Sequence, residues 1–332
     1  MNSTTSSIAE DATSEPAHEA HDPFLAHHFE SQRQQFDAGK LGMWLFLVTE
    51  IMFFSGLFVA YAVYRSHHPE VFVYAHQFLD KGLGAVNTII LLFSSLTMAW
   101  GVRCAQLNQR RGLVWCLAIT LACASMFLGI KSVEYSHKWD EGLLWARYFA
   151  PTTHAHGNTW TLVWFSLPAA IAVAVCGPLA LACKVRGAKR GWIVAGTATC
   201  AALAYFGGVT AGIGIPVIEQ QFSQSTVAVD EESVVATSDG ASSTSEHDPL
   251  AHSEETAAPA LAGIFFSIYF TMTGIHAIHV LAGMGVILWI LSRSVRGDFG
   301  SNYFGPVDYV GLYWHLVDMV WIFLFPLLYL IH

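Results

Sequence analysis

The sequence predicts an all-α fold, a polytopic membrane bundle of seven transmembrane helices with its N-terminus inside and its C-terminus outside. The first observation is composition: 54% of the 332 residues are hydrophobic and only 12% are charged, whereas soluble domains carry about 25% charged residues. The second is that the apolar residues gather in long blocks, as membrane spans require. This composition and the net charge of −9 exclude a soluble protein, a disordered protein and a basic nucleic-acid binder.

Seven charge-poor stretches predict the spans. A helix rises about 1.5 Å per residue and a bilayer core is about 30 Å thick, so one span needs about 20 residues. The first stretch holds one charge before Arg65, namely Glu50, and the last holds only Asp318. The expected spans are 41–65, 84–102, 112–130, 159–183, 191–218, 259–292 and 309–331.

The positive charges predict the orientation, because Lys and Arg collect in cytoplasmic segments. With the N-terminus inside, every inner loop is basic, whereas the outer segment 219–258 has nine acids and neither Lys nor Arg. The alternation follows every second span and therefore supports the span count. The inner segments contain Arg33, Lys40, Arg103, Arg110, Arg111, Lys184, Arg186, Lys189, Arg190, Arg293 and Arg296.

Two polar segments accompany the spans. Residues 1–40 form an acidic tail without the basic start and early apolar run of a signal peptide, so we expect the tail to be retained. Residues 219–258 are rich in Ser, Thr, Ala and acids, a composition that cannot bury a core. We expect a flexible outer loop, which either stays solvated or docks a basic partner through its negative charge.

Titratable side chains inside the spans are candidates for function, because each costs several kcal/mol in hydrocarbon unless it is paired. Glu50 lies in the first span, His276 and His279 in the sixth, and His315 and Asp318 in the seventh. Their similar depth suggests that a bundle brings them together. The cluster would ligate a metal or haem, relay protons, or tie helices together by hydrogen bonds. No H-x-x-x-H, H-E-x-x-H or C-x-x-C motif supports a metal site.

A separate pair lies at the outer end of the third span. Lys131 and Glu134 are three residues apart, so they face the same side of a helix and favour an ion pair. At the end of a span, long charged side chains commonly reach toward the headgroups. We therefore expect an interfacial ion pair with a structural role and no catalytic one.

Several strings resemble subunit III of the haem–copper respiratory oxidases. The strings follow the order found in that family, and the resemblance as a whole covers about 200 of the 332 residues. The most specific are the G-x-H-x-x-H-V and Y-W-H-x-V-D-x-x-W patterns of the last two spans. The strings are GMWLFLVTEIMFF at 42–54, NTIILLFSSLTMAW at 87–100, FLGIKSVEY at 127–135, FTMTGIHAIHVLAG at 270–283 and YWHLVDMVW at 313–321.

The resemblance also implies an insertion. Short members of the family have five helices that begin with the glutamate helix, and long members add two helices before it. This sequence lacks those two and instead places a helix pair between the third and fourth family helices, which preserves the topology of the rest. The expected units are the tail 1–40, family helices at 41–158, the inserted pair at 159–218, the acidic loop at 219–258, and the last two family helices at 259–332.

The family's properties imply roles for the candidate residues. Glu50 matches the buried helix glutamate, His279 its hydrogen-bond partner and His276 the first histidine of the same motif. Arg293 matches a position that meets a lipid phosphate, for which an arginine fork is well suited. His315 and Asp318 match the last-helix motif, where we expect hydrogen bonds between helices. The resemblance implies bound phospholipid, no metal in this chain, and haem and copper in the partner subunits I and II.

The resulting expectation is an accessory, non-redox subunit of a proton-pumping cytochrome c oxidase in an energy-transducing membrane, such as a bacterial plasma membrane. The chain would be part of an enzyme complex without a catalytic centre of its own, and other respiratory complexes are possible partners of the insertion or the acidic loop. Subunit III of a quinol oxidase and the related subunit of a nitric-oxide reductase stay open, because the electron donor binds elsewhere. A stand-alone proton-coupled transporter is the alternative from another class, although no inverted repeat supports it.

Overall fold

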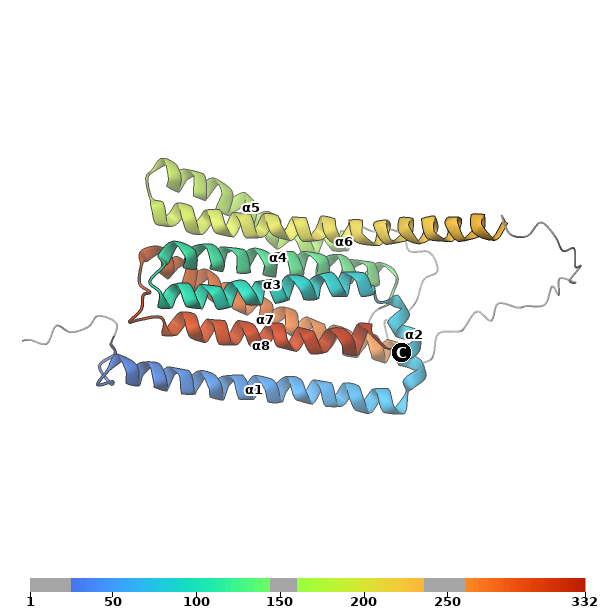
Figure 1. Cartoon of the computed structure of the whole chain (residues 1–332), viewed down its shortest axis with the longest axis horizontal. Coiled ribbons are helices and arrows are strands. Elements are labelled where there is room, and N and C mark those ends of the chain that lie inside the picture. The colour runs from blue at the N-terminus through green and yellow to red at the C-terminus, as the bar shows by residue number, and fades with distance from the viewer. Residues whose placement is uncertain (1–24, 144–159, 236–260, 332) are drawn as a thin grey trace, which may run out of the picture.

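The computed structural model describes residues 25–143, 160–235 and 261–331. In this part of the chain, seven helices are long and apolar enough to cross a membrane, which confirms the predicted class and span count. They run alongside one another, and the C-terminus lies at the opposite end of the bundle from the start of α1 (Figure 1). The long helices are α1 (Gln32–His67), α3 (Lys81–Gln106), α4 (Arg110–Asp140), α5 (Trp160–Val185), α6 (Lys189–Val235), α7 (Ala262–Arg296) and α8 (Gly305–Tyr329).

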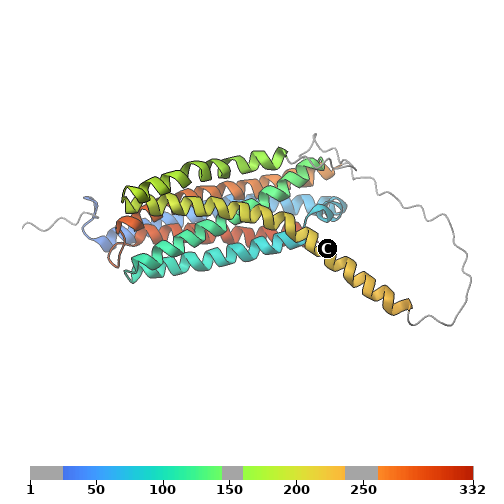
Figure 2. The ribbon, with the colours of Figure 1, turned by 90° about the horizontal axis from the view of Figure 1, so that it is seen from above.

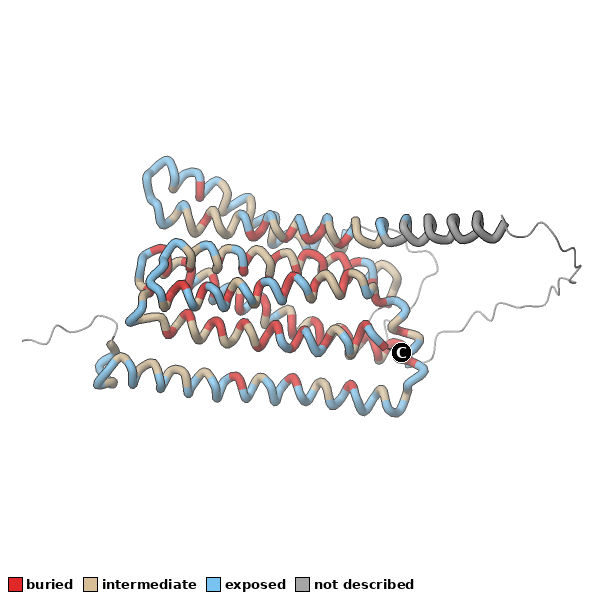
Figure 3. The backbone as a smooth tube through the Cα atoms, viewed as in Figure 1, coloured by how far each residue is buried: buried red, intermediate tan, exposed pale blue. Residues whose placement is uncertain are grey.

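Buried residues concentrate on α3, α4, α7 and α8, which form the core of the bundle (Figure 3). The connection from α1 to α3 consists of the short helix α2 (Pro69–Ala75) and the 3-10 turn η1 (His76–Phe78). By contrast, α1 and α5 expose most of their apolar side chains. Apolar faces of this extent are what a lipid environment or a partner helix covers.

The first helix starts earlier than the hydropathy pattern indicates. Ser31 caps α1 by accepting a hydrogen bond from the backbone N–H of Gln34 at 3.2 Å, so the helix begins within the polar segment 1–40, before the expected span start at residue 41. Hydropathy detects only the apolar part of a helix, whereas the helical backbone continues through polar residues at its end. The extended start is held against α8, because Tyr309 donates a hydrogen bond to the Phe36 carbonyl at 2.9 Å and Lys40 pairs with Asp308 at 3.3 Å.

The inserted helices α5 and α6 pack on the side of the core opposite α1 (Figures 1 and 2). α6 lies directly on α4, and glycines allow the two backbones to approach closely. A methyl group added at Gly208 would lie 2.2 Å from the Met126 carbonyl oxygen, and one added at Gly129 would lie 2.2 Å from that of Tyr205. Only glycine fits at these two positions without displacing a helix.

Two further boundaries differ from the prediction. α4 continues to Asp140, ten residues past the expected end at 130, which places Lys131 and Glu134 inside the helix. α6 continues to Val235, so residues 219–235 are helical and the expectation of a loop there is wrong. Ser, Thr, Ala and Glu are all compatible with a helix, and composition alone does not mark its end. The rest of the expected loop, 236–258, lies outside the described residues.

Candidate functional site

Glu50 of α1 and His279 of α7 meet between the two helices. Glu50 Oε2 lies 3.0 Å from His279 Nε2, which confirms the hydrogen-bond partner that the resemblance implied. The other ring nitrogen, Nδ1, lies 2.9 Å from the backbone carbonyl oxygen of Ile275 on the same helix. Because a carbonyl oxygen only accepts hydrogen bonds, we assign a hydrogen to His279 Nδ1.

The hydrogen on His279 Nδ1 determines how many protons the Glu50–His279 contact requires. A neutral imidazole carries one N–H, so with Nδ1 protonated His279 Nε2 presents a lone pair to the Glu50 carboxyl. The Glu50–His279 hydrogen bond therefore needs one more proton, either on Nε2, as an imidazolium–carboxylate pair, or on Glu50, as a carboxylic acid. The arrangement is a one-proton site near the midpoint of α1.

The surroundings of this pair hold the imidazole in place. The Phe54 ring lies edge-on to it, with the ring centres 5.1 Å apart, and Tyr313 donates a hydrogen bond to the His279 carbonyl at 3.0 Å. The side chains of Glu50 and His279 are 19% and 21% exposed, so the pair is reached from the side of the bundle and is not enclosed by it.

A second group of charges is buried between α4, α7 and α8. Lys131 Nζ lies 2.7 Å from Glu134 Oε2, which confirms the predicted i,i+3 ion pair. Lys138 Nζ lies 3.0 Å from the other oxygen, Oε1. The Glu134 side chain is only 3% exposed, so this pair is enclosed by the bundle and does not reach outward as we had expected. α4 continues past this point to Asp140, and its charged face packs against α7 and α8 through Tyr269 and Tyr329.

Two tyrosines complete this group. Tyr269 donates a hydrogen bond to Glu134 Oε1 at 2.8 Å, and Tyr329 donates to the same oxygen at 2.5 Å. Lys131 also hydrogen-bonds the Tyr329 hydroxyl, and its Nζ lies 4.5 Å from the centre of the Trp321 ring. One carboxylate thus faces two ammonium groups, and the aromatic faces help to stabilise the additional positive charge.

Lys138, Tyr269 and Tyr329 were not among the residues predicted from the sequence. The i,i+4 spacing from Glu134 to Lys138 was a readable signal of a second ion pair. Nothing in the sequence singled out the tyrosines, because they come from α7 and α8 and reach Glu134 only through the packing of three helices. We call Lys131, Glu134, Lys138, Tyr269 and Tyr329 the buried ion cluster.

His276 lies apart from both groups. It is fully buried on the core side of α7, with its ring centre 5.7 Å from that of Phe127 and 5.4 Å from that of Trp321. Neither ring nitrogen has a hydrogen-bond partner within the described residues. His276 and His279 point about 60° apart around the helix axis at 3.6 residues per turn, and this difference directs one into the core and the other toward α1.

His315 and Asp318 both bond to α3. His315 Nδ1 lies 2.6 Å from Ser95 Oγ, and Ser94 Oγ donates to Asp318 Oδ2 at 3.3 Å. Trp314 Nε1 donates to the same serine at 3.1 Å. These contacts confirm the expected hydrogen bonds between helices. We had expected the mid-span polar groups to form one cluster, and this expectation is wrong. Each helix directs its polar groups toward a different neighbouring helix.

Arg293 lies near the C-terminal end of α7. Its Nε donates a hydrogen bond to Asp298 Oδ2 at 2.9 Å. The guanidinium carbon lies 5.3 Å from the centre of the Trp289 ring, 5.0 Å from that of Phe299 and 5.6 Å from that of Tyr303. This arginine is therefore anchored within the chain, beside three aromatic rings.

Within the described ranges, no three His, Cys, Asp or Glu side chains come together in a way that would hold a metal ion. Glu50, His279, His315 and Asp318 each have at least one hydrogen-bond partner on another helix. Together, the fold and these sites define a multi-pass α-helical membrane protein whose titratable side chains bond across neighbouring helices.

The chain belongs to the cytochrome c oxidase subunit III family. The family model described as "Cytochrome c oxidase subunit III" matches residues 20–142 and 251–332, which contain α1 to α4 and α7 to α8. The stretch between them, with α5 and α6, lies outside the match.

Individual relatives show the same similarity. The chain is 38% identical over 124 residues to "Cytochrome c oxidase subunit 3" of Synechocystis sp., covering 36% of this chain and 53% of the relative. It is 39% identical over 69 residues to the protein of that name from Thermostichus vulcanus, covering 20% of this chain and 34% of the relative. A "Heme-copper oxidase subunit I+III" of Aeropyrum pernix is 37% identical over 71 residues, covering 21% of this chain and 9% of the relative. The chain thus matches about half or less of the length of these relatives.

Proposed function

We propose that this chain is the accessory, non-redox subunit III of a proton-pumping cytochrome c oxidase. In that complex it stabilises the catalytic subunit, holds lipid and supports proton uptake, while haem and copper reside in the partners. The observation that carries the proposal is the Glu50–His279 pair. It joins two helices that the family model matches, and it holds one proton in a region where an unpaired charge would cost several kcal/mol.

The proposed partners are oxidase subunits I and II. The name of the Aeropyrum pernix relative combines subunits I and III, which supports a direct association of this chain with a subunit I. The names of the other relatives support cytochrome c as the electron donor in preference to a quinol. A companion subunit II with the ligand set of a dicopper centre would establish the donor.

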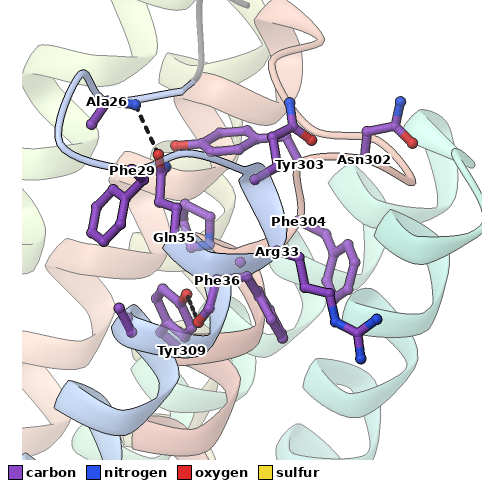
Figure 4. A pocket seen from close by; sticks show the side chains of 14 residues that line it. Ala26, Phe29, Arg33, Gln35, Phe36, Asn302, Tyr303, Phe304 and Tyr309 are labelled. Carbon is purple, nitrogen blue, oxygen red and sulfur yellow. Dashed lines mark hydrogen bonds between the residues drawn. The ribbon is translucent and has the colours of Figure 1, made fainter.

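The proposed lipid site lies at the end of the bundle where α1 begins. A pocket of about 730 Å³ opens there between α1 and the turn that joins α7 to α8 (Figure 4). Phe29, Phe36 and Phe304 give it apolar walls, and Arg33 supplies a positive charge. Tyr303 lines the same pocket and lies beside Arg293. An aromatic pocket with guanidinium groups near it suits a phospholipid at headgroup depth.

The proposed orientation places this pocket on the inner side of a bacterial plasma membrane, in agreement with the basic inner segments. The experiment that tests the proposal is purification of the full-length chain in a mild detergent, followed by a visible spectrum and identification of the accompanying chains. We expect haem absorption together with subunits I and II. A pure chain without haem proteins, active in proton-coupled transport after reconstitution, would refute the proposal.

A further inference from the structure

Three fully buried polar side chains in the core have atoms without a protein partner. Asn87 of α3, His276 of α7 and Asp318 of α8 are 0%, 1% and 2% exposed. Within the described residues, five of their atoms have no hydrogen-bond partner. They are both amide atoms of Asn87, both ring nitrogens of His276, and Oδ1 of Asp318. An unsatisfied buried polar group costs about 1–3 kcal/mol, and five such atoms in one bundle call for a ligand.

The contacts of α3 place Asn87 at the same interface with α8 as Asp318. A methyl group added at Gly84 would lie 3.2 Å from the Tyr329 ring, and Ser94 bonds Asp318 at 3.3 Å. Asn87 is three residues after Gly84 and seven before Ser94, so all three lie on one face of α3. Its amide is therefore on the face of α3 that turns toward α8, between the levels of Tyr329 and Asp318.

His276 approaches the same region from α7. Its ring packs 5.4 Å from that of Trp321, and Thr88 of α3 accepts a hydrogen bond from the Trp321 Nε1 at 3.1 Å. Lys131 of the buried ion cluster lies 4.5 Å from the centre of the same ring. Trp321 is thus surrounded by polar groups from α3, α4 and α7, and the unpartnered ring of His276 packs against it.

We propose that ordered water molecules bind Asn87, His276 and Asp318 and form a hydrated column in the part of the core that contains the C-terminal end of α8. Water is the ligand whose size and bonding suit these atoms, because a buried water typically makes about three hydrogen bonds to otherwise unsatisfied polar groups. The amide, the imidazole and the carboxyl together supply both donors and acceptors. The inference is independent of the proposed oxidase function.

The column has an entrance at that end of the bundle. A cavity of about 820 Å³ is lined by Asp80 and Lys81 at the start of α3 and by Glu134 and Lys138 of the buried ion cluster. The ion cluster thus connects the cavity to the region around Trp321. In the opposite half, Met98, Leu117, Ile287, Ile290 and Leu291 are fully buried. The hydroxyls in that half are already bonded, because Thr97 and Thr120 bond each other at 2.8 Å and Ser294 donates to the Ile290 carbonyl at 2.8 Å. We therefore expect the column to end near Asp318.

The test is a high-resolution cryo-EM structure of the full-length chain, purified with the subunits that accompany it. We expect solvent density at hydrogen-bond distance, about 2.7–3.2 Å, from His276 and from Asp318 Oδ1. In H276L the density beside position 276 should vanish while that beside Asp318 remains. Empty space at all three side chains, or direct hydrogen bonds among them, would overturn the proposal. The wild-type map decides this even where H276L fails to assemble.

Radiolytic hydroxyl labelling of the same wild-type preparation gives a second readout. Bound water generates radicals in place, so we expect oxidation of the fully buried Trp321. Met98 is equally buried and readily oxidised, but it lies in the apolar half and should stay unmodified. Equal labelling of the two, or labelling of Met98 alone, contradicts a column confined to one half of the core.

Discussion

Glu50 Oε2 and His279 Nε2 lie 3.0 Å apart and join α1 to α7, although α1 packs mainly against α8. Because His279 Nδ1 is bonded to the Ile275 carbonyl, a hydrogen bond between Glu50 and His279 requires one proton between the carboxyl and the imidazole. The pair therefore links the attachment of a peripheral helix to the protonation of a mid-membrane site.

Replacement of Glu50 by Gln separates these two roles. The Gln amide still donates a hydrogen bond to His279 Nε2 but no longer titrates. We expect the complex to assemble normally and to retain most of its oxygen-consumption rate, which an oxygen electrode measures on the purified enzyme. A collapse of turnover in a fully assembled complex would place Glu50 in the path of the protons.

Replacement of His279 by Ala removes the link itself. We expect this chain to dissociate more readily from the complex in detergent, because α1 loses its bond to α7 and Glu50 is left unpaired. The haem spectrum should stay that of the wild type. Subunit composition after size-exclusion chromatography and a visible spectrum provide the measurement, and an altered spectrum with intact attachment would count against the assignment.

Within the buried ion cluster, we expect the loss of Glu134 to cost more stability than the loss of Lys131. Glu134→Gln leaves Lys131 and Lys138 without a counter-charge in the core, and a broken buried pair costs about 3–5 kcal/mol. Lys131→Met leaves the 3.0 Å pair of Lys138 and Glu134 with balanced charge, so its cost should be smaller. Thermal unfolding of the two purified variants measures the order, and equal midpoints would contradict this view of the cluster.

Adjacent glycines test how the inserted helices are attached. Gly208→Ala places a methyl group against the Met126 carbonyl, and overpacking of this kind costs about 1–3 kcal/mol. Gly207→Ala is the matched control, because a methyl group there meets nothing within 4 Å and alanine favours the helix. We expect a lower thermal midpoint for the first variant and an unchanged or higher one for the second. The reverse order would mean that α6 does not lie on α4 as described.

Arg293 and Arg296 offer a comparison for the lipid site. Arg293 lies beside the pocket residue Tyr303, at 5.6 Å from its ring centre, whereas Arg296, one turn away, is exposed. We expect Arg293→Met to reduce the phospholipid that native mass spectrometry detects on the purified complex, and Arg296→Met to leave it unchanged. Equal lipid content in both variants would remove Arg293 from the proposed site.

Hydropathy and charge were sufficient to predict the seven spans, and helical spacing was sufficient for the Lys131–Glu134 pair. The Glu50–His279 contact followed from the resemblance, because no local rule relates residues 229 positions apart. The isolation of His276, the two tyrosines on Glu134 and the docking of α6 through Gly208 depend on the rotation of each helix about its axis. Hydropathy does not encode that rotation, because lipid and core are both apolar.

The most direct test of the central claim is to dissociate this chain from the purified complex and to record spectra and metal content of both fractions. We predict that all haem and copper stay with the partner subunits and that the released chain has neither. Haem or copper bound to the released chain through its mid-membrane histidines would contradict an accessory, non-redox role.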